Sequence, residues 1–313
     1  MTIAFGPVPS RRLGRSLGIN NIPPKFCSYS CQYCQVGITH GKIVEPREFY
    51  TPEAIYQAVS AQLQSAQHAE DPVDYLTFVP DGEPTLDAML GQAIDRLRPL
   101  NIPIAVISNA SLLWRKEVRA ALARADWVSV KVDSVAEAVW RQINRPHASL
   151  QLNAVLDGIR RFARQFRGEL VSETMLVRGI NDHPQALAGV ADFLQQLGVA
   201  RAYLAIPTRP PAEPGIRGPG EQAVNQAYQI LASRLPRVEY LIGYEGDAFA
   251  YSGDVRQDLL SITAVHPMRA SAVRALLSRA GADWSVVEGL IAEHRLRQVG
   301  YLGEDYFVRA FAP

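Results

Sequence analysis

The sequence has little of what marks secreted, membrane-spanning or strongly charged proteins. It contains only three cysteines in 313 residues, and this small odd number argues against a disulfide framework. No run approaches the roughly 20 apolar residues that span a membrane. The first residues lack the basic stretch and apolar core of a signal peptide, so we expect a cytoplasmic chain without a membrane partner. The formal net charge of +1 gives no overall electrostatic reason to bind nucleic acid, although a local basic patch stays compatible with it.

The few cysteines that are present lie together in one eight-residue window, Cys27-Ser-Tyr-Ser-Cys31-Gln-Tyr33-Cys34. Thiolates bind soft metals, and three on one short loop can hold three irons of a four-iron cluster. The fourth iron then has no protein ligand and is open to a substrate or cofactor, which favours chemistry over structural support. A structural zinc site completed by His40 is the alternative, because such sites close with four ligands.

Short apolar runs alternate with longer amphipathic stretches, which is typical of βα units with a parallel sheet. Helices are predicted between strands, for example at 88–97, 149–165 and 184–197, with Thr51 as the N-cap of an earlier helix. The length suits one α/β barrel of about 250 residues with a small second domain, here 1–250 and 251–313. Six strands are predicted, at 17–22, 74–79, 102–108, 127–132, 170–177 and 202–206.

Polar residues follow these strands at the edge where active sites gather in parallel α/β folds. Singly, such residues are often turn formers, but here they recur after strand upon strand. The candidate residues at these strand ends, polar ones together with Gly82, Pro84 and Ile206, are in chain order Asp81, Gly82, Glu83 and Pro84; Ser108 and Asn109; Lys131 and Asp133; Glu173 and Asn181; and Ile206 with Arg209.

The spacing CxxxCx-aromatic-C resembles the signature of the radical S-adenosylmethionine (SAM) superfamily. The resemblance implies a partial (β/α)6 TIM-like barrel, with a [4Fe-4S] cluster on Cys27, Cys31 and Cys34 and SAM at the open iron. It also implies reductive cleavage of SAM to a 5′-deoxyadenosyl radical, with the electron supplied by an external donor of flavodoxin or ferredoxin type.

The stretch Asp81-Gly82-Glu83-Pro84 resembles the GGEP loop that holds the amino group of SAM in this superfamily. Asp81 replaces the first glycine, and a carboxylate suits an ammonium group. Lys131, Asp133, Glu173 and Arg209 are the candidate catalytic residues. The cofactor contacts implied are Tyr33, Asp81, Gly82, Glu83, Pro84, Ser108, Asn109, Lys131, Asp133, Glu173, Asn181 and Ile206.

Blocks at 6–20, 80–86, 107–113, 130–133 and 176–182 look like those of iron–sulfur oxidoreductases similar to the tRNA wyosine-base synthase. Wyosine-type synthases carry further cysteines for a second cluster, whereas here all three are used by the first. We therefore expect this chain to share radical initiation with these synthases but not to catalyse the wyosine reaction. A tRNA base, a peptide or protein substrate, and a non-enzymatic zinc-binding adaptor stay as alternatives.

The C-terminal stretch has the order of a winged helix. A helix or turn is predicted at 258–264, helices at 268–280 and 284–294, the last with Asp283 as N-cap, and strands at 296–300 and 306–311. Its basic and acidic residues nearly balance, so nucleic-acid binding, peptide binding and a structural or dimer contact all stay open. A second group of arginines is expected to form a solvated helix face: Arg141, Arg145, Arg160, Arg161, Arg164 and Arg167.

Overall fold

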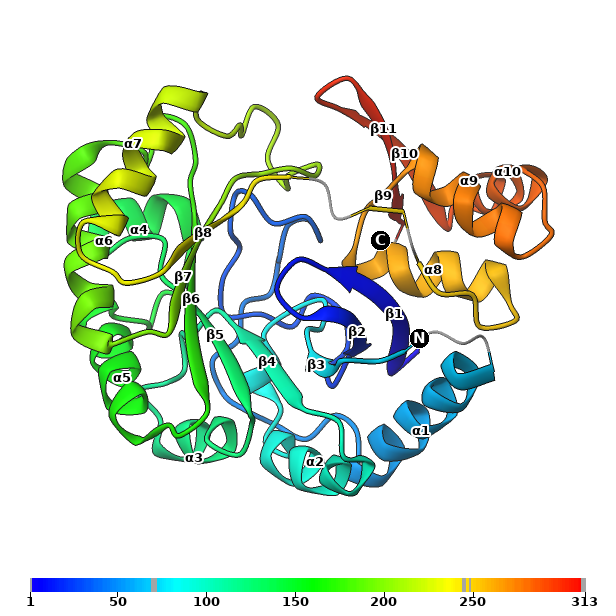
Figure 1. The fold of residues 1–313 in the computed structure, drawn as a ribbon, viewed down its shortest axis with the longest axis horizontal. Coiled ribbons are helices and arrows are strands. Elements are labelled where there is room, and N and C mark those ends of the chain that lie inside the picture. The colour runs from blue at the N-terminus through cyan, green and yellow to red at the C-terminus, as the bar shows by residue number, and fades with distance from the viewer. Residues whose placement is uncertain (1, 69–71, 244–245, 248, 311–313) are drawn as a thin grey trace.

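The chain forms a curved sheet with helices on its outer face, and a small C-terminal part lies beside the open side of the curve (Figure 1). The computed structural model describes residues 2–68, 72–243, 246–247 and 249–310. The interior of the curve holds the cysteine loop, which connects the second strand to the first helix.

The sheet has eight strands in sequence order, of which β2 to β8 run parallel and β1 pairs antiparallel with β2. All six predicted strands are present and correspond to β2 to β7, which confirms the TIM-like half-barrel. Strands β1 and β8 were not predicted; β8 is short and only its last residue is buried. The strands are β1 Ala4–Ser10, β2 Gly14–Ile19, β3 Tyr75–Phe78, β4 Ile104–Ser108, β5 Trp127–Lys131, β6 Glu169–Met175, β7 Arg201–Ala205 and β8 Val238–Leu241.

Seven helices connect the parallel strands and cover the outer face of the sheet (Figure 1). The Thr51 hydroxyl accepts a hydrogen bond from the Ala54 amide at 3.2 Å, so the predicted N-cap is present. No helix in the described part of the chain is both long and apolar enough to cross a membrane. The helices are α1 Pro52–His68, α2 Leu90–Leu97, α3 Lys116–Leu122, α4 Glu137–Asn144, α5 Leu152–Gln165, α6 Pro184–Leu197 and α7 Glu221–Ala232.

The hairpin of β1 and β2 turns into the interior of the half-barrel (Figure 1). Leu13, in its turn, is buried with Trp127, Tyr203 and Leu241, which project inward from three strands of the sheet. Gly18 lies under the Phe5 ring, and a Cβ there would fall 2.0 Å from a ring carbon. Packing of this turn among inward-facing side chains brings the neighbouring Arg11 and Arg12 into the barrel.

The C-terminal part has its own apolar core and a three-stranded antiparallel sheet in the order β10-β11-β9. Residues 268–280 are not one helix as predicted, because Met268 and Arg269 pair with β11 before the helix begins. The winged-helix assignment and the boundary at residue 250 stay predictions, and predicted strand residue 311 lies outside the described residues. The elements are α8 Val255–Val265, β9 Met268–Arg269, α9 Ala270–Arg279, α10 Ser285–Ala292, β10 Leu296–Tyr301 and β11 Glu304–Arg309.

Candidate active site at the strand ends

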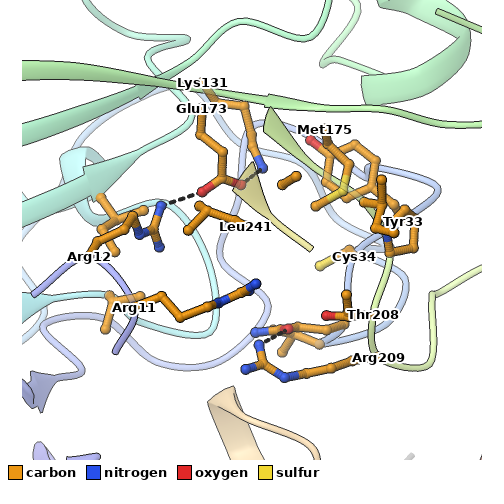
Figure 2. A pocket seen from close by; sticks show the side chains of 17 residues that line it. Arg11, Arg12, Tyr33, Cys34, Lys131, Glu173, Met175, Thr208, Arg209 and Leu241 are labelled. Atoms are coloured by element: carbon orange, nitrogen blue, oxygen red, sulfur yellow. Dashed lines mark hydrogen bonds and ion pairs between the residues drawn. The ribbon is translucent and has the colours of Figure 1, made fainter. Parts of the chain in front are cut away.

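A cavity of about 260 Å³ lies at the carboxyl ends of the parallel strands (Figure 2). It brings together several residues predicted from sequence, namely Tyr33, Cys34, Lys131, Glu173, Ile206 and Arg209. Two lining residues that sequence reasoning missed are Arg11 and Arg12. The remaining lining residues are Gln35, Val36, Val79, Ile107, Met175, Ala205, Pro207, Thr208 and Leu241.

The cysteine loop presents three half-buried thiols that form no disulfide. The Cys34 amide donates to the Cys31 carbonyl at 3.1 Å, and the Gly37 amide donates to the Cys34 carbonyl at the same distance. Two asparagine amides reach the sulfurs, from Asn109 Nδ2 to Cys27 Sγ at 3.6 Å and from Asn144 Nδ2 to Cys31 Sγ at 3.4 Å. Hydrogen bonds to ligand sulfurs are one of the ways in which proteins tune an iron–sulfur cluster.

Burial raises the pKa of two of these thiols, those of Cys27 and Cys31. It raises the pKa of Cys27 well above its ordinary value and that of Cys31 to about 12, with neighbouring acidic groups adding to the effect. Both thiols are therefore protonated, and metal binding displaces their protons.

The donor set fits a four-iron cluster better than a single zinc ion. His40, the fourth ligand that the zinc alternative requires, is exposed. A cluster spreads three thiolates over three irons, and the chain has three cysteines in all.

Asp133 links the cysteine loop to the sheet. Its carboxylate accepts hydrogen bonds from the Tyr33 hydroxyl, from Asn144 Nδ2 at 2.7 Å and from the Met175 amide at 2.8 Å. Burial raises its pKa, although Lys131 and these hydrogen bonds oppose the rise. Asn181 donates from Nδ2 to the backbone carbonyl of Asp133 at 2.9 Å. Asp133 and Asn181, both predicted from sequence as cofactor contacts, thus make hydrogen bonds within the protein that support the cysteine loop.

Glu83 ties together two neighbouring strand ends. Its Oε1 accepts from Ser108 Oγ at 2.7 Å and from Thr85 Oγ1 at 2.5 Å, while Oε2 accepts from the Asn109 amide at 2.7 Å. A side chain at Gly82 would place its Cβ 2.0 Å from the Phe26 carbonyl oxygen. The loop therefore lies directly against the cysteine loop, and Pro84 opens the single 3₁₀ turn that follows.

Asp81 differs from Glu83 in that neither of its carboxylate oxygens has a hydrogen-bond partner, although the residue is only 3% exposed. Burial raises its pKa to about 8, against the lowering effect of Lys25 and Arg309. Buried polar groups are normally paired, so this carboxylate fits a site for a cation. Its backbone is fixed beside the cysteine loop, because the Lys25 amide donates to the Asp81 carbonyl at 2.8 Å.

Lys131 and Glu173 form an ion pair across β5 and β6, with Nζ and Oε1 2.5 Å apart, and Arg12 binds the other carboxylate oxygen (Figure 2). Burial alone would raise the pKa of Glu173, but the two cations outweigh it and lower the pKa to about 2. For Lys131, Glu173 and Asp133 outweigh burial and raise the pKa. Glu173 is therefore ionised and Lys131 protonated at neutral pH.

The segment 206–209 closes the cavity between the barrel and the C-terminal part. Arg209 Nη1 donates to Gln35 Oε1 at 2.7 Å, and Nη2 lies 3.1 Å from His266 Nε2. The Tyr301 hydroxyl donates to the Pro207 carbonyl at 3.0 Å, and the Tyr306 hydroxyl donates to the Thr208 carbonyl at 2.9 Å. The C-terminal part thus holds one wall of the cavity in place.

Comparison of the sequence with known proteins identifies the family of this chain. The family model for the Radical SAM superfamily covers residues 21–190. The UPF0026 protein MJ1312 of Methanocaldococcus jannaschii is 43% identical over 99% of this chain and 96% of that protein. A UPF0026 protein of Helicobacter pylori is 35% identical over 66% of this chain and 67% of that protein.

Solved structures share the fold at low sequence identity. TYW1 with a lysine-pyruvate adduct bound has a TM-score of 0.55 at 14% identity, over 71% of this chain and 74% of that one. A radical SAM methyltransferase from Sphaerobacter thermophilus has a TM-score of 0.53 at 19% identity, over 72% of this chain and 66% of that one. The family match and the full-length relative agree with this fold, and the chain belongs to the Radical SAM superfamily, whose members are enzymes that use a [4Fe-4S] cluster and SAM.

Proposed function

We propose that Cys27, Cys31 and Cys34 hold one [4Fe-4S] cluster, and that the chain acts with SAM on a substrate bound in the 260 Å³ cavity. The observation that carries the proposal is the position of the three thiols, which lie on a loop whose Cys34 lines that cavity. When bound and reduced by an external flavodoxin- or ferredoxin-type donor, the cluster supplies the electron that cleaves SAM to a 5′-deoxyadenosyl radical.

The residues of the DGEP loop suit the amino group of SAM. Asp81 offers a buried carboxylate without a hydrogen-bond partner, and charge-assisted hydrogen bonding to an ammonium would satisfy it. Gly82 keeps the backbone close to the cysteine loop, and Glu83 braces the loop against Ser108 and Asn109. In this proposal Asp81 binds the cofactor directly, whereas Glu83 positions the loop.

The other predicted residues are proposed to orient ligands and exclude water. Tyr33 lines the cavity beside Cys34, and its hydroxyl is fixed by Asp133. Lys131 and Glu173 present a fixed pair of charges from adjacent strands. Arg209 and the rest of segment 206–209 cover the cavity, which keeps water away from reactive species.

Anaerobic reconstitution tests the proposal. The wild-type chain should bind about four irons and release 5′-deoxyadenosine with dithionite and SAM, whereas Cys31→Ala should lose both properties. His40→Ala is the matched control and should keep both. A Cys31→Ala chain that retains cluster absorbance and SAM cleavage, or a wild-type chain that binds zinc in place of iron, would overturn the proposal.

The arginine group near α5 does not favour a nucleic-acid substrate. Arg141 pairs with Glu137 and Arg161 with Asp157, each one helical turn apart. Arg145 pairs with Glu213, and Arg160 lies over the Phe193 ring. These contacts support the predicted solvated helix face.

A further inference from the structure

Two of the three cysteine sulfurs lie against the side-chain amide of an asparagine. Asn109 Nδ2 is 3.6 Å from Cys27 Sγ, and Asn144 Nδ2 is 3.4 Å from Cys31 Sγ. Each asparagine is far from its cysteine in sequence, by 82 and 113 residues respectively, so only the folded chain brings them together. An asparagine presents two N–H donors and one carbonyl oxygen. The group that faces each sulfur therefore decides whether a thiolate there is stabilised or repelled.

Hydrogen bonds to neighbouring groups fix the orientation of the Asn109 amide. Its Nδ2 donates to Ser28 Oγ at 3.0 Å, and its Oδ1 accepts from the Ser111 backbone amide at 2.9 Å. A reversed amide would place its NH2 group against the Ser111 N–H, and two donors would then face each other. The Ser28 and Ser111 hydroxyls lie 2.6 Å apart, which holds the two serines around Asn109. An N–H donor therefore faces Cys27 Sγ.

Asn144 is oriented by a buried carboxylate. Its Nδ2 donates to Asp133 Oδ2 at 2.7 Å and to the Tyr33 hydroxyl at 3.2 Å. A reversed amide would place its carbonyl oxygen against the carboxylate, where two acceptors would repel. The backbone carbonyl of Asn144 accepts from the Ser30 amide at 3.1 Å, so this end of α4 is also bound to the cysteine loop. An N–H donor therefore faces Cys31 Sγ as well.

Both asparagines connect a sulfur to a carboxylate of the barrel. The Asn109 backbone amide donates to Glu83 Oε2 at 2.7 Å, and the Asn144 side chain donates to Asp133. Glu83 and Asp133 are buried, and they follow two different strands, β3 and β5. The two carboxylates hold the donors in place in the folded chain. No reorganisation of these donors is then needed when negative charge appears on the sulfurs.

Amide donors aimed at ligand sulfurs affect the two oxidation states of a cluster unequally. Reduction adds one negative charge, and hydrogen bonds to a charged acceptor are stronger than those to a neutral one. Donors at the sulfurs therefore stabilise the reduced state more than the oxidised state, which raises the reduction potential. The low dielectric constant around buried groups strengthens this effect.

We propose that Asn109 and Asn144 are positioning residues that hold the Cys27 and Cys31 thiolates as cluster ligands and raise the reduction potential of the [4Fe-4S] cluster. This inference rests on the proposed function, because it requires the cluster on these thiols. Neither asparagine lines the cavity of about 260 Å³. Each therefore acts through its cysteine and not through contact with the substrate.

The midpoint potential of the reconstituted cluster, measured anaerobically and without SAM, tests the proposal. Asn109→Leu removes the donor, and its equilibrium constant for reduction should fall about tenfold. For a one-electron couple this is a shift of about 59 mV to a more negative potential. Asn109→Asp keeps an acceptor for the Ser111 amide but places an anionic oxygen near Cys27 Sγ, so its potential should fall further. A purely structural role predicts the opposite order, because Asp preserves more of the local hydrogen bonds than Leu.

Asn153→Leu and Asn153→Asp are the matched controls, because they make the same changes at an exposed position of α5. Both should keep the wild-type potential. Asn144→Leu repeats the measurement at Cys31 if circular dichroism shows that the Asn109 variants do not fold, and its potential should also fall. A wild-type potential in a folded, cluster-loaded Asn109→Leu or Asn144→Leu chain, or a smaller fall in Asn109→Asp than in Asn109→Leu, overturns the proposal.

Competition with an iron chelator measures how firmly the thiolates hold the cluster. Asn109→Leu and Asn144→Leu should need about tenfold to a hundredfold less chelator than the wild type to lose half of their iron, which is the range for loss of a partner of a metal ligand. Wild-type resistance in both variants would overturn the positioning role. A wild-type chain that binds no four-iron cluster would instead reject the proposed function, so the two failures are distinguishable.

Discussion

The two walls of the cavity differ in how their polar groups are satisfied. On the cysteine side, Asn144 donates hydrogen bonds to Asp133 and to Cys31 Sγ, and Asn109 donates to Cys27 Sγ. On the opposite side, Arg12 and Lys131 share the carboxylate of Glu173, and Arg209 contacts Gln35 and His266. The comparison teaches that neutral amide donors around one buried carboxylate hold the cysteine side, whereas ion pairs and cationic side chains build the opposite side.

Glu173 joins the two walls, and its removal should have the largest effect on stability. Glu173→Gln leaves Lys131 and Arg12 without their shared carboxylate. Breaking a buried ion pair on one side costs about 3–5 kcal/mol, so we expect urea denaturation to show a loss of that size. Glu137→Gln removes an exposed partner of Arg141 and should cost at most about 1 kcal/mol. Equal losses in the two variants would show that Glu173 is not structurally central.

Asp81 differs from its neighbours because neither of its carboxylate oxygens has a hydrogen-bond partner. The pH dependence of the free energy of unfolding tests this difference. Its pKa is raised from 3.8 to about 8 by burial. Between these values the folded state keeps a proton that the unfolded state has released, so stability falls as pH rises. Asp81→Asn lacks this loss. Its free energy of unfolding should therefore rise relative to that of the wild type by about 1 kcal/mol per pH unit from pH 5 to pH 8.

Unfolding free energies of both chains across this range measure the effect of Asp81. Asp95→Asn, at an exposed ion pair with Arg124, should keep a constant difference from the wild type. A pH-independent difference for Asp81→Asn would mean that the Asp81 carboxylate is ionised in the folded protein.

Asn144 tests whether the cysteine side depends on its complete hydrogen-bond network. Asn144→Ala removes donors to Asp133 and to Cys31 Sγ, and loss of a hydrogen bond to a charged group costs about 1.5–3 kcal/mol. We expect a loss of that size in urea denaturation of the metal-free chain. Asn153→Ala, at an exposed position of α5, should change the free energy of unfolding by less than about 0.5 kcal/mol. Indistinguishable variants would contradict the importance of this network.

Tyr306 tests how firmly the C-terminal part holds the arginine side, and the expected effect is the smallest. Tyr306→Phe removes the hydroxyl that donates to the Thr208 carbonyl and accepts from Arg269 Nε. The expected loss is about 1 kcal/mol in the free energy of unfolding. Tyr251→Phe removes a hydroxyl contact to the Gly253 carbonyl outside the cavity and is the matched control. Equal losses in the two variants would show that the Tyr306 hydroxyl adds no stability by holding segment 206–209.

The fold and the strand-end residues could be predicted because both follow from local patterns. Apolar runs give β2 to β7, and the polar residues after them, such as Glu83, Lys131 and Glu173, meet at one edge of a parallel sheet. Strands β1 and β8 were missed, and β8 has four residues of which only the last is buried, so it gives a weak apolar signal.

Arg11 and Arg12, unlike Arg209, could not be predicted from local patterns as cavity residues. Arg11 is in the cavity only because a hairpin turn is packed inside the half-barrel by Leu13, and no feature near residue 11 indicates that packing. Asn144 lies at the end of helix α4 and reaches Cys31 across the fold. Contacts between residues so distant in sequence are set by tertiary structure. The one local signal near Asn144 is the Arg145–Pro146 pair that follows it, which marks a helix end.

The inserted hairpin has a consequence for the order in which the enzyme is made. Arg11 leaves the ribosome before the cysteine loop, and Leu241 and Tyr306, whose hydroxyl donates to the Thr208 carbonyl, follow much later. Domains generally fold as units during synthesis. Here the residues that line the cavity or hold its wall come from nearly the whole length of the chain. A nascent chain that already exposes its three thiols therefore has an incomplete cavity. The cavity is complete only after β11, the strand that carries Tyr306, has been synthesised.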